Sequence, residues 1–199
     1  MAPVPALAPA QAQAITSRCR TTWVALQGAL VGVLLVTAVL FAGPAAAALP
    51  QAYGAMVIEP TGAPARAEFD LTAAVARARR QGKRLYIYLG ASDCAFCRTY
   101  ESFLDLNTTE LLPHFANYLI VDLRSSLRVQ ASALYIRVGR SSLPYLDFQR
   151  SIGDARTRQI VYPSVWLLDG QLKPLMQMPA GTGTFQTVPE QLEILRLEQ

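Results

Sequence analysis

The sequence has few residues of the kinds that bind metals. It contains three cysteines, Cys19, Cys94 and Cys97, and a single histidine, His114. Structural zinc usually takes four cysteine or histidine ligands, and a c-type haem needs a histidine directly after C-x-x-C, where this chain has Arg98. A copper chaperone would need wider cysteine spacing and a supporting histidine. We therefore expect no metal site and no other cofactor.

Charged residues are also scarce. They make up 16% of the chain, and the formal net charge is only +4. Arg18 and Arg20 supply half of this excess, and both precede a long apolar run. Such a small positive charge on the remainder does not predict binding to nucleic acid.

Charge is missing altogether from residues 23–43, which follow these two arginines and precede a run of alanines at 45–48. A basic start, an apolar segment and small residues in A-x-A spacing are typical of a secretory signal peptide, with cleavage after Ala47 or Ala48. An uncleaved anchor is the alternative, because an apolar run of this length can span a bilayer of ~30 Å. Residues 1–48 are thus predicted to be a signal peptide or an N-terminal membrane anchor.

Either form of the leader predicts an extracytoplasmic protein, for example a periplasmic one, that is released or held at the inner membrane. Cys19 precedes the apolar run, so the exported part contains only Cys94 and Cys97. Residues 49–68 are rich in proline, glycine and alanine and are predicted to be a tether, with a short first strand possible at 55–58.

The two exported cysteines lie between an expected strand at 85–89 and an expected helix from Ala95 to Leu106. Unpaired N–H groups and the dipole in the first turn of a helix lower the pKa of a thiol there. Strand, C-x-x-C and helix in this order predict thiol–disulfide exchange. The same pair could instead form one static bridge.

Further elements follow from apolar patterning, helix caps and turn residues. Asp70 and Gly82 are expected to begin and end one helix, and Pro174 implies an edge strand or a bulge. The segment 124–158 has seven arginines and two aspartates, and we interpret it as a helical insertion that is either solvated or a docking surface for an acidic partner. The expected elements are helix 71–81, strand 118–123, helix 131–138, loop 139–144, strand 165–168, strand 172–178 and helix 188–197.

This order resembles the thioredoxin fold over residues 69–199, on the strength of Cys94-Ala95-Phe96-Cys97 after a strand and Tyr162-Pro163-Ser164 before one. The resemblance implies an α/β, three-layer domain. Its central mixed sheet would have four or five strands flanked by helices, with the helical insertion before the cis-proline strand.

The resemblance also implies roles for individual residues. Pro163 would be cis, and the backbone of Tyr162 would pair with the cysteine-containing segment of a substrate. Cys94 would attack a substrate disulfide, and the more buried Cys97 would resolve the mixed disulfide.

Several residues depart from the family pattern. Asp93 stands where members often have tryptophan, and Tyr88 stands where thioredoxin has a buried carboxylate for proton transfer. Glu101 could replace that carboxylate, but we interpret it as an exposed helix residue. Ala95 and Phe96 provide no histidine between the cysteines. An ionised Asp93 would raise the pKa of Cys94.

These departures favour a less oxidising couple. The sequence therefore predicts an exported thiol:disulfide oxidoreductase that works as a reductase or isomerase. Its expected partners are cysteine-containing exported proteins and a membrane protein that supplies electrons. The alternative is a non-enzymatic thioredoxin-like adaptor of an envelope assembly with a static Cys94–Cys97 bridge.

Overall fold

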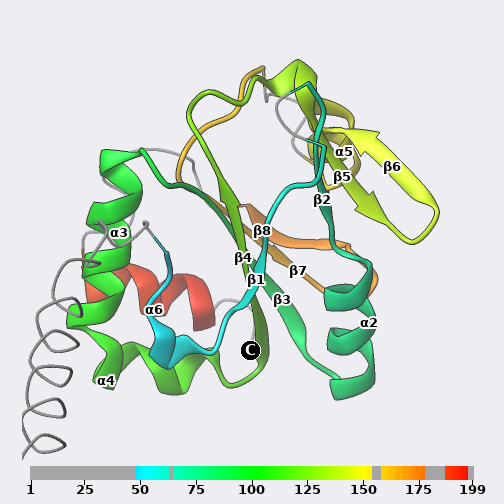
Figure 1. The fold of residues 1–199 in the computed structure, drawn as a ribbon. Coiled ribbons are helices and arrows are strands. Elements are labelled where there is room, and N and C mark those ends of the chain that lie inside the picture. Colours follow the sequence, from blue (N-terminus) through cyan, green and yellow to red (C-terminus); the bar gives the residue numbers. More distant parts are fainter. Residues whose placement is uncertain (1–47, 63–64, 154–157, 178–186, 197–199) are drawn as a thin grey trace, which may run out of the picture. The chain divides into compact units, whose positions relative to one another are not determined.

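The computed structural model of the chain describes residues 48–62, 65–153, 158–177 and 187–196 (Figure 1). Residues 1–47 of the predicted leader therefore lie outside the described residues. Residue 178, the last of the strand expected at 172–178, also lies outside them. Within the part of the chain that is described, no helix is both long and apolar enough to cross a bilayer.

The central sheet is mixed and has five strands in the order β1-β4-β3-β7-β8. β1 and β3 pair in parallel with β4, whereas β7 pairs antiparallel with both β3 and β8. The strands are β1 (Met56–Ile58), β3 (Arg84–Ala91), β4 (Tyr118–Ser125), β7 (Ser164–Leu168) and β8 (Pro174–Gln177). The predicted strands at 85–89, 118–123 and 165–168 are thus confirmed.

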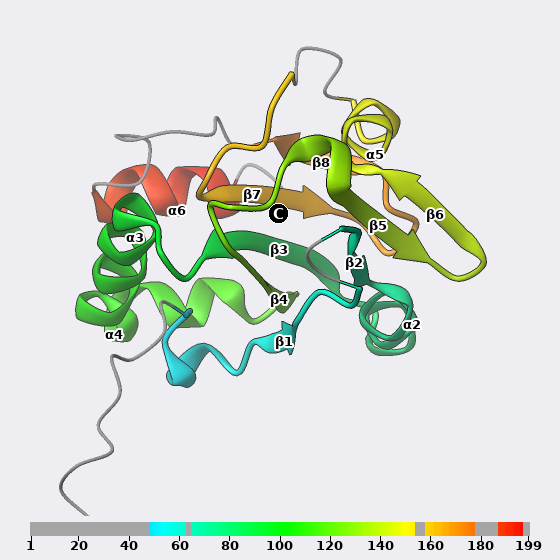
Figure 2. The same cartoon turned by 45° about the horizontal axis from the view of Figure 1, so that its top comes forward.

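Both faces of the sheet are covered, as the apolar strands predict. Along β3, Leu85, Ile87 and Leu89 belong to one core, and Tyr86 and Tyr88 belong to the other. The first core includes α2 (Thr72–Gln81) and α5 (Tyr145–Ser151), and the second includes α3 (Ala95–Leu106), α4 (Thr108–Leu111) and α6 (Val188–Arg196). Figures 1 and 2 show these two groups of helices on opposite sides of the sheet. The predicted three-layer α/β class is confirmed.

Local signals set several element ends as expected. The carboxylate of Asp70 accepts a hydrogen bond of 2.8 Å from the Thr72 amide at the start of α2. Gly82 ends this helix with a φ of 61°, in the left-handed region that favours glycine. β8 is an edge strand, and its pairing with β7 shifts register at Leu167 and Leu168, which agrees with Pro174 in this strand.

The predicted helical insertion at 124–158 is wrong. β4 continues to Ser125, and a short 3₁₀ turn (Ala131–Ala133) leads into β5 (Leu134–Val138) and β6 (Ser141–Pro144) before the short α5. These strands form a second sheet with β2 (Ala67–Asp70), in the order β2-β5-β6. The helix expected at 131–138 is largely a strand because Leu134 and Ile136 alternate toward the core.

The predicted tether at 49–68 is also not what the structure contains. Leu49 and Tyr53 are buried against the core on the α3 side, with Tyr53 in a 3₁₀ turn at Gln51–Tyr53. β1 follows as an edge strand of the main sheet, close to the strand expected at 55–58. The apolar residues of this segment outweigh its content of proline and glycine, and they fix the segment to the domain.

Candidate active site

The two cysteines lie where β3 passes into α3. Cys94 is the N-cap residue of α3, and its Sγ accepts a hydrogen bond of 3.1 Å from the amide of Cys97. The two residues form a disulfide. The Ala91 amide, at the end of β3, donates to Cys97 Sγ at 3.5 Å. The end of β3 therefore supplies one N–H group to Cys97 Sγ, and the first turn of α3 supplies one to Cys94 Sγ. This agrees with the predicted position of the cysteines between a strand and a helix.

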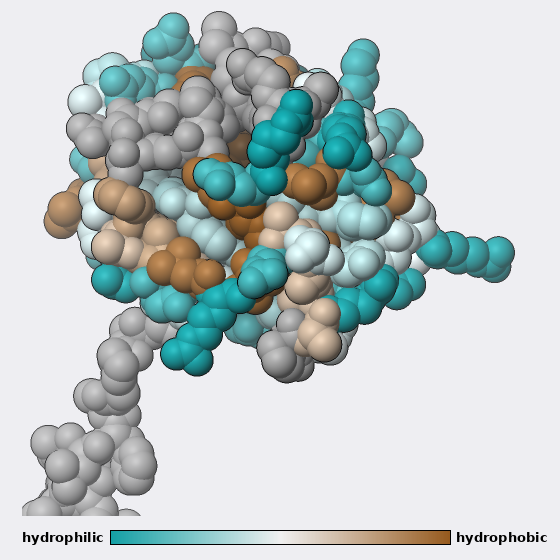
Figure 3. Space-filling view, turned by 90° about the horizontal axis from the view of Figure 1, so that it is seen from above, coloured by the Kyte–Doolittle hydropathy of each residue, from teal (hydrophilic) through white to brown (hydrophobic). Residues whose placement is uncertain are grey.

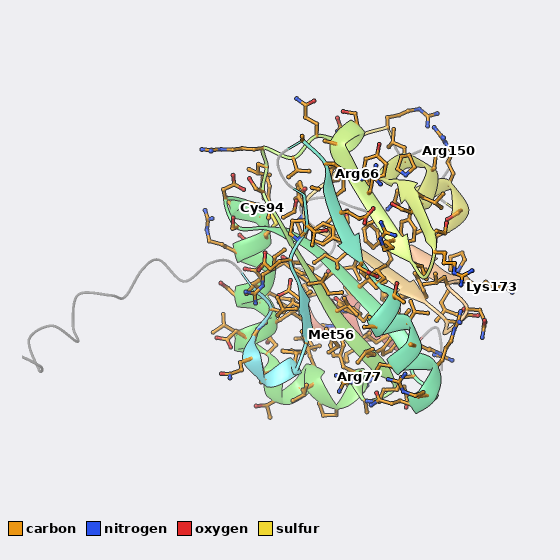
Figure 4. All side chains as sticks on the ribbon, turned by 45° about the vertical axis from the view of Figure 1, so that its right-hand side comes forward. Met56, Arg66, Arg77, Cys94, Arg150 and Lys173 are labelled. Carbon is orange, nitrogen blue, oxygen red and sulfur yellow. A yellow bond between two sulfur atoms is a disulfide. The ribbon has the colours of Figure 1, made fainter. Side chains whose placement is uncertain are left out.

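Exposure differs along this short ring. Cys97 is fully buried, and 3% of Cys94 is exposed. Between them, Ala95 is exposed and Phe96 is 57% exposed. Figure 4 labels Cys94 at the start of α3. A reagent that reaches the disulfide from solvent therefore meets Cys94 first.

Tyr162 lies beside the disulfide. Its carbonyl oxygen is 3.8 Å from Cys94 Sγ, and the Tyr162–Pro163 peptide bond is cis. Its side chain packs against the cluster formed by Ala91 and the two cysteines. The Tyr162 hydroxyl donates a hydrogen bond of 2.8 Å to Ser125 Oγ at the end of β4, and burial raises the pKa of this phenol.

Asp93 is held by the segment that follows β4. Its carboxylate accepts hydrogen bonds from the Leu127 amide at 2.8 Å and from the Ser126 hydroxyl at 3.3 Å. The Leu127 amide is the main reason that the pKa of Asp93 is lowered, so this residue carries its negative charge at neutral pH. Leu127 itself is 54% exposed and brings a second apolar side chain to this end of the sheet.

Glu101 is buried, and its interpretation as an exposed helix residue is wrong. Only 7% of Glu101 is exposed, and it accepts a hydrogen bond of 2.8 Å from the Tyr88 hydroxyl. Burial raises the pKa of this carboxyl group. The sequence did contain the relevant signal, because Glu101 lies four residues after the buried Cys97 and thus on the same face of α3.

A second buried carboxylate, Asp122, was not predicted at all. It is 1% exposed, and burial raises its pKa despite an ion pair with Arg124 at 3.2 Å. The alternation of β4 could have indicated it, since Ile120 and Asp122 face the same side of the strand. Asp122 lies close enough to Glu101 for its negative charge to raise the pKa of Glu101 further.

The structure thus brings together the five residues that the sequence singled out. Cys94, Cys97 and Tyr162 are in contact, Pro163 follows Tyr162, and Asp93 precedes Cys94. Figure 3 looks onto the end of the domain where α3 begins, and hydrophobic residues form patches there among hydrophilic ones. No cluster of three or more His, Cys, Asp or Glu side chains suited to a metal occurs within the described ranges.

Neither a family model nor a curated protein sequence matches this chain. Among solved structures, the chain is similar to the exposed lipoprotein thioredoxin Etrx1 of Streptococcus pneumoniae strain TIGR4. The identity is 15%, the match covers 62% of this chain and 88% of that one, and the TM-score is 0.34. The disulfide between Cys94 and Cys97 fits a thiol oxidoreductase in general terms. The chain's own strand order, its cysteine helix and the strand after Pro163 make the fold thioredoxin-like.

Proposed function

We propose that this chain is an exported thiol:disulfide oxidoreductase that reduces or isomerises disulfides through Cys94 and Cys97. The observation that carries the proposal is the position of Cys94 at the N-terminus of α3, bonded to the Cys97 amide and 3.8 Å from the Tyr162 carbonyl. A sulfur at this position receives an N–H group and the positive end of the helix dipole, both of which favour its thiolate.

The reaction begins with the reduced protein. The Cys94 thiolate attacks one sulfur of a substrate disulfide, and the other substrate sulfur leaves as a thiolate that takes up a proton. Cys97 then loses its proton and attacks Cys94 Sγ, which releases the second substrate sulfur and forms the Cys94–Cys97 disulfide. Two electrons thus pass to the substrate, and a membrane electron donor returns the protein to its reduced form.

Residues around the disulfide support this order of attack. Cys94 contributes all of the exposed surface of the pair, since Cys97 is fully buried. The carbonyl of Tyr162 lies beside Cys94 and offers a backbone acceptor to an extended substrate segment. Phe96, between the two cysteines, and Leu127, whose amide is bonded to Asp93 just before Cys94, are exposed apolar side chains near the disulfide for a substrate to contact.

Glu101 is the carboxylate that we propose for proton transfer from Cys97. It is one helical turn after Cys97, on the buried side of α3. Burial raises the pKa of its carboxyl group, which suits a group that accepts and returns a proton. Glu101 therefore takes the role that a carboxylate at the position of Tyr88 has in thioredoxin.

The reducing direction follows from the charges near Cys94. Asp93 is ionised and adjacent in sequence, and a like charge opposes formation of the Cys94 thiolate. The Leu127 amide and Ser126 hydroxyl bind this carboxylate and reduce its effect without removing it. A less stable thiolate makes the disulfide the favoured state, so the reduced protein readily gives up its electrons.

The substrates that we propose are exported proteins with disulfides, met in the periplasm or another extracytoplasmic compartment after the leader has directed the chain there. One observation favours the adaptor alternative: so little of Cys94 is exposed that the disulfide could serve as a static bridge. A pair that is always oxidised in cells and never linked to a partner would establish that alternative.

Substitution of the cysteines one at a time tests the enzyme. Cys97→Ser should accumulate mixed disulfides with exported proteins, which diagonal electrophoresis and mass spectrometry identify. Cys94→Ser should lose reduction of an insulin-type disulfide and trap nothing. Cys19→Ser is the matched control and should behave as the unaltered chain. Full activity in the Cys94 variant would rule out this residue as the nucleophile.

A further inference from the structure

The first described residues of the chain lie directly on the two buried carboxylates. The backbone N–H group of Ala48 acts on Glu101 and lowers the pKa of its carboxyl group, and the amide of Leu49 donates a hydrogen bond of 3.3 Å to Asp122 Oδ2. The side chain of Leu49 is buried in the core on the α3 side of the sheet, which anchors this segment. Two consecutive backbone N–H groups therefore serve a pair of carboxylates from α3 and β4.

The charges of this site do not balance. Arg124 is the cation that pairs with Asp122, through the same Oδ2 that accepts the Leu49 amide. The other oxygen, Oδ1, has no hydrogen-bond partner among the described residues although Asp122 is almost fully buried. Glu101 has the neutral donors Tyr88 and Ala48 as its partners. One guanidinium group is thus present for two carboxyl groups, and burial of an ionised carboxylate without a paired cation lowers the stability of the folded state.

The predicted cleavage site supplies the missing cation at this position. A leader peptidase that hydrolyses the bond between Ala47 and Ala48 adds one water: Ala47 leaves with a carboxylate, and the nitrogen of Ala48 becomes an amine that binds a proton. The N–H group on this nitrogen already lowers the pKa of Glu101. Conversion to an ammonium group adds two N–H donors and one positive charge at this position.

We propose that removal of the leader after Ala47 leaves the α-ammonium group of Ala48 bound to Glu101, beside Asp122, as the buried cation of this site. The mature N-terminus is then an internal part of the fold on the same helix as the cysteines. The inference rests on the export in the proposed function, and it is independent of the direction of electron transfer.

The ammonium ion would also set the charge of Glu101. Burial alone favours the protonated acid, and a cation in contact favours the carboxylate. The other charged and titratable groups around the pair are Tyr88 on β3, Arg124 on β4 and Glu59 after β1. Removal of the leader would therefore lower the pKa of Glu101, the residue one helical turn after Cys97.

The test uses the full chain, expressed with its own leader in an exporting bacterial host. Mass spectrometry of the exported product should find Ala48 at the N-terminus. The rate of its acylation by an amine reagent is then followed against pH. A free α-amine has a pKa of about 7.7–8.0, and the ion pair should move the midpoint up by one unit or more, so that labelling at pH 7.5 is about ten-fold slower than in the Glu101→Gln variant.

Two controls separate charge from folding. Glu110→Gln removes an exposed acid from α4 and should leave the midpoint unchanged. The unaltered protein in urea should show an ordinary midpoint, with labelling of the exposed Lys173 as internal standard, so the result does not depend on folding of the Glu101 variant. A different N-terminal residue, or equal midpoints in the native and urea-unfolded protein, would overturn the proposal. Trapping of partners by Cys97→Ser reports separately on the proposed enzyme.

Discussion

Gly90 is the residue that gives the Tyr88 ring its place beside Glu101. A Cβ atom at position 90 would lie 2.6 Å from Cε1 and 2.9 Å from the hydroxyl oxygen of Tyr88. Tyr88 is itself fully buried, so its ring has little room to move away. The absence of a side chain at Gly90 thus permits the hydrogen bond that links β3 to α3.

We predict that Gly90→Ala destabilises the domain by about 1–3 kcal/mol, the usual cost of overpacking a core. Urea unfolding of the oxidised protein measures this change. The same substitution in a Tyr88→Val background should cost clearly less, because the ring that clashes is gone. Equal losses in both backgrounds would show that the Tyr88 contact does not constrain position 90.

Asp93 permits a test in which charge changes while shape is kept. Asp93→Asn retains an oxygen that can accept from the Leu127 amide but loses the negative charge. The pKa of Cys94 should fall, by up to about one unit at low salt. The rate of alkylation of Cys94 against pH, in a Cys97→Ser background, reports this pKa. An unaltered alkylation profile would contradict the direct electrostatic effect that we assign to Asp93.

The residues that the sequence singled out lie together where a motif fixes local geometry. Cys94 and Cys97 follow from their spacing, and Tyr162 and Pro163 follow from the resemblance to a known strand opening. The exposure of Glu101 was predicted wrongly because acidic residues on helices are usually exposed. A buried acid is recognisable only with its partners, and Tyr88 and Ala48 come from distant parts of the chain.

At the scale of elements, one acidic residue joins all three strands of the second sheet. Glu68 on β2 is bound by Arg137 on β5, by Ser142 on β6 and by Arg66. The Ser142 hydroxyl and the two guanidinium groups lower the pKa of Glu68 from 4.5 to about 2, against the opposing effect of burial. The native state therefore binds the carboxylate form more strongly than the unfolded chain does.

This lowered pKa predicts how stability depends on acid. The contribution of Glu68 is fully present above about pH 4.5 and is lost as the pH falls toward about 2. In Glu68→Gln, unfolding free energies measured by urea should lack that part of the acid-induced decrease and be lower at pH 7. Asp147→Asn, which removes an exposed ion pair with Arg150, is the control and should change the profile little. Parallel profiles for the Glu68 variant and the unaltered protein would contradict this.

The second sheet also contains the segment whose secondary structure was predicted wrongly from the sequence. Residues 131–138 contain a short apolar pattern that fits one turn of helix or one strand about equally well. Pairing decides the outcome: Ile136 lies between Leu143 on the neighbouring strand β6 and Phe69 on β2, and Phe69 is far from it in sequence. The longer strands and α3 were predicted because their patterns span more residues.

At the scale of the whole molecule, the reduction potential of the Cys94–Cys97 disulfide depends on every group that affects the two thiols. Equilibration of the protein with glutathione buffers should give a midpoint nearer to the roughly −270 mV of thioredoxin than to the roughly −120 mV of a strong oxidant. The reasons are the charge of Asp93 and the lack of histidine between the cysteines. A midpoint above about −150 mV would assign the protein to oxidation of thiols instead.

The pairing of β1 bears on when the protein can finish folding. Met56 on β1 pairs with Val121 on β4, so the first strand needs a partner from the second half of the chain. During the export that we propose, the start of the exported domain crosses the membrane first, and β1 must wait for β4 to arrive. Closure of such a long loop is entropically costly and slow. The leader junction therefore stays open to a peptidase at least until β4 has been translocated and can pair with β1.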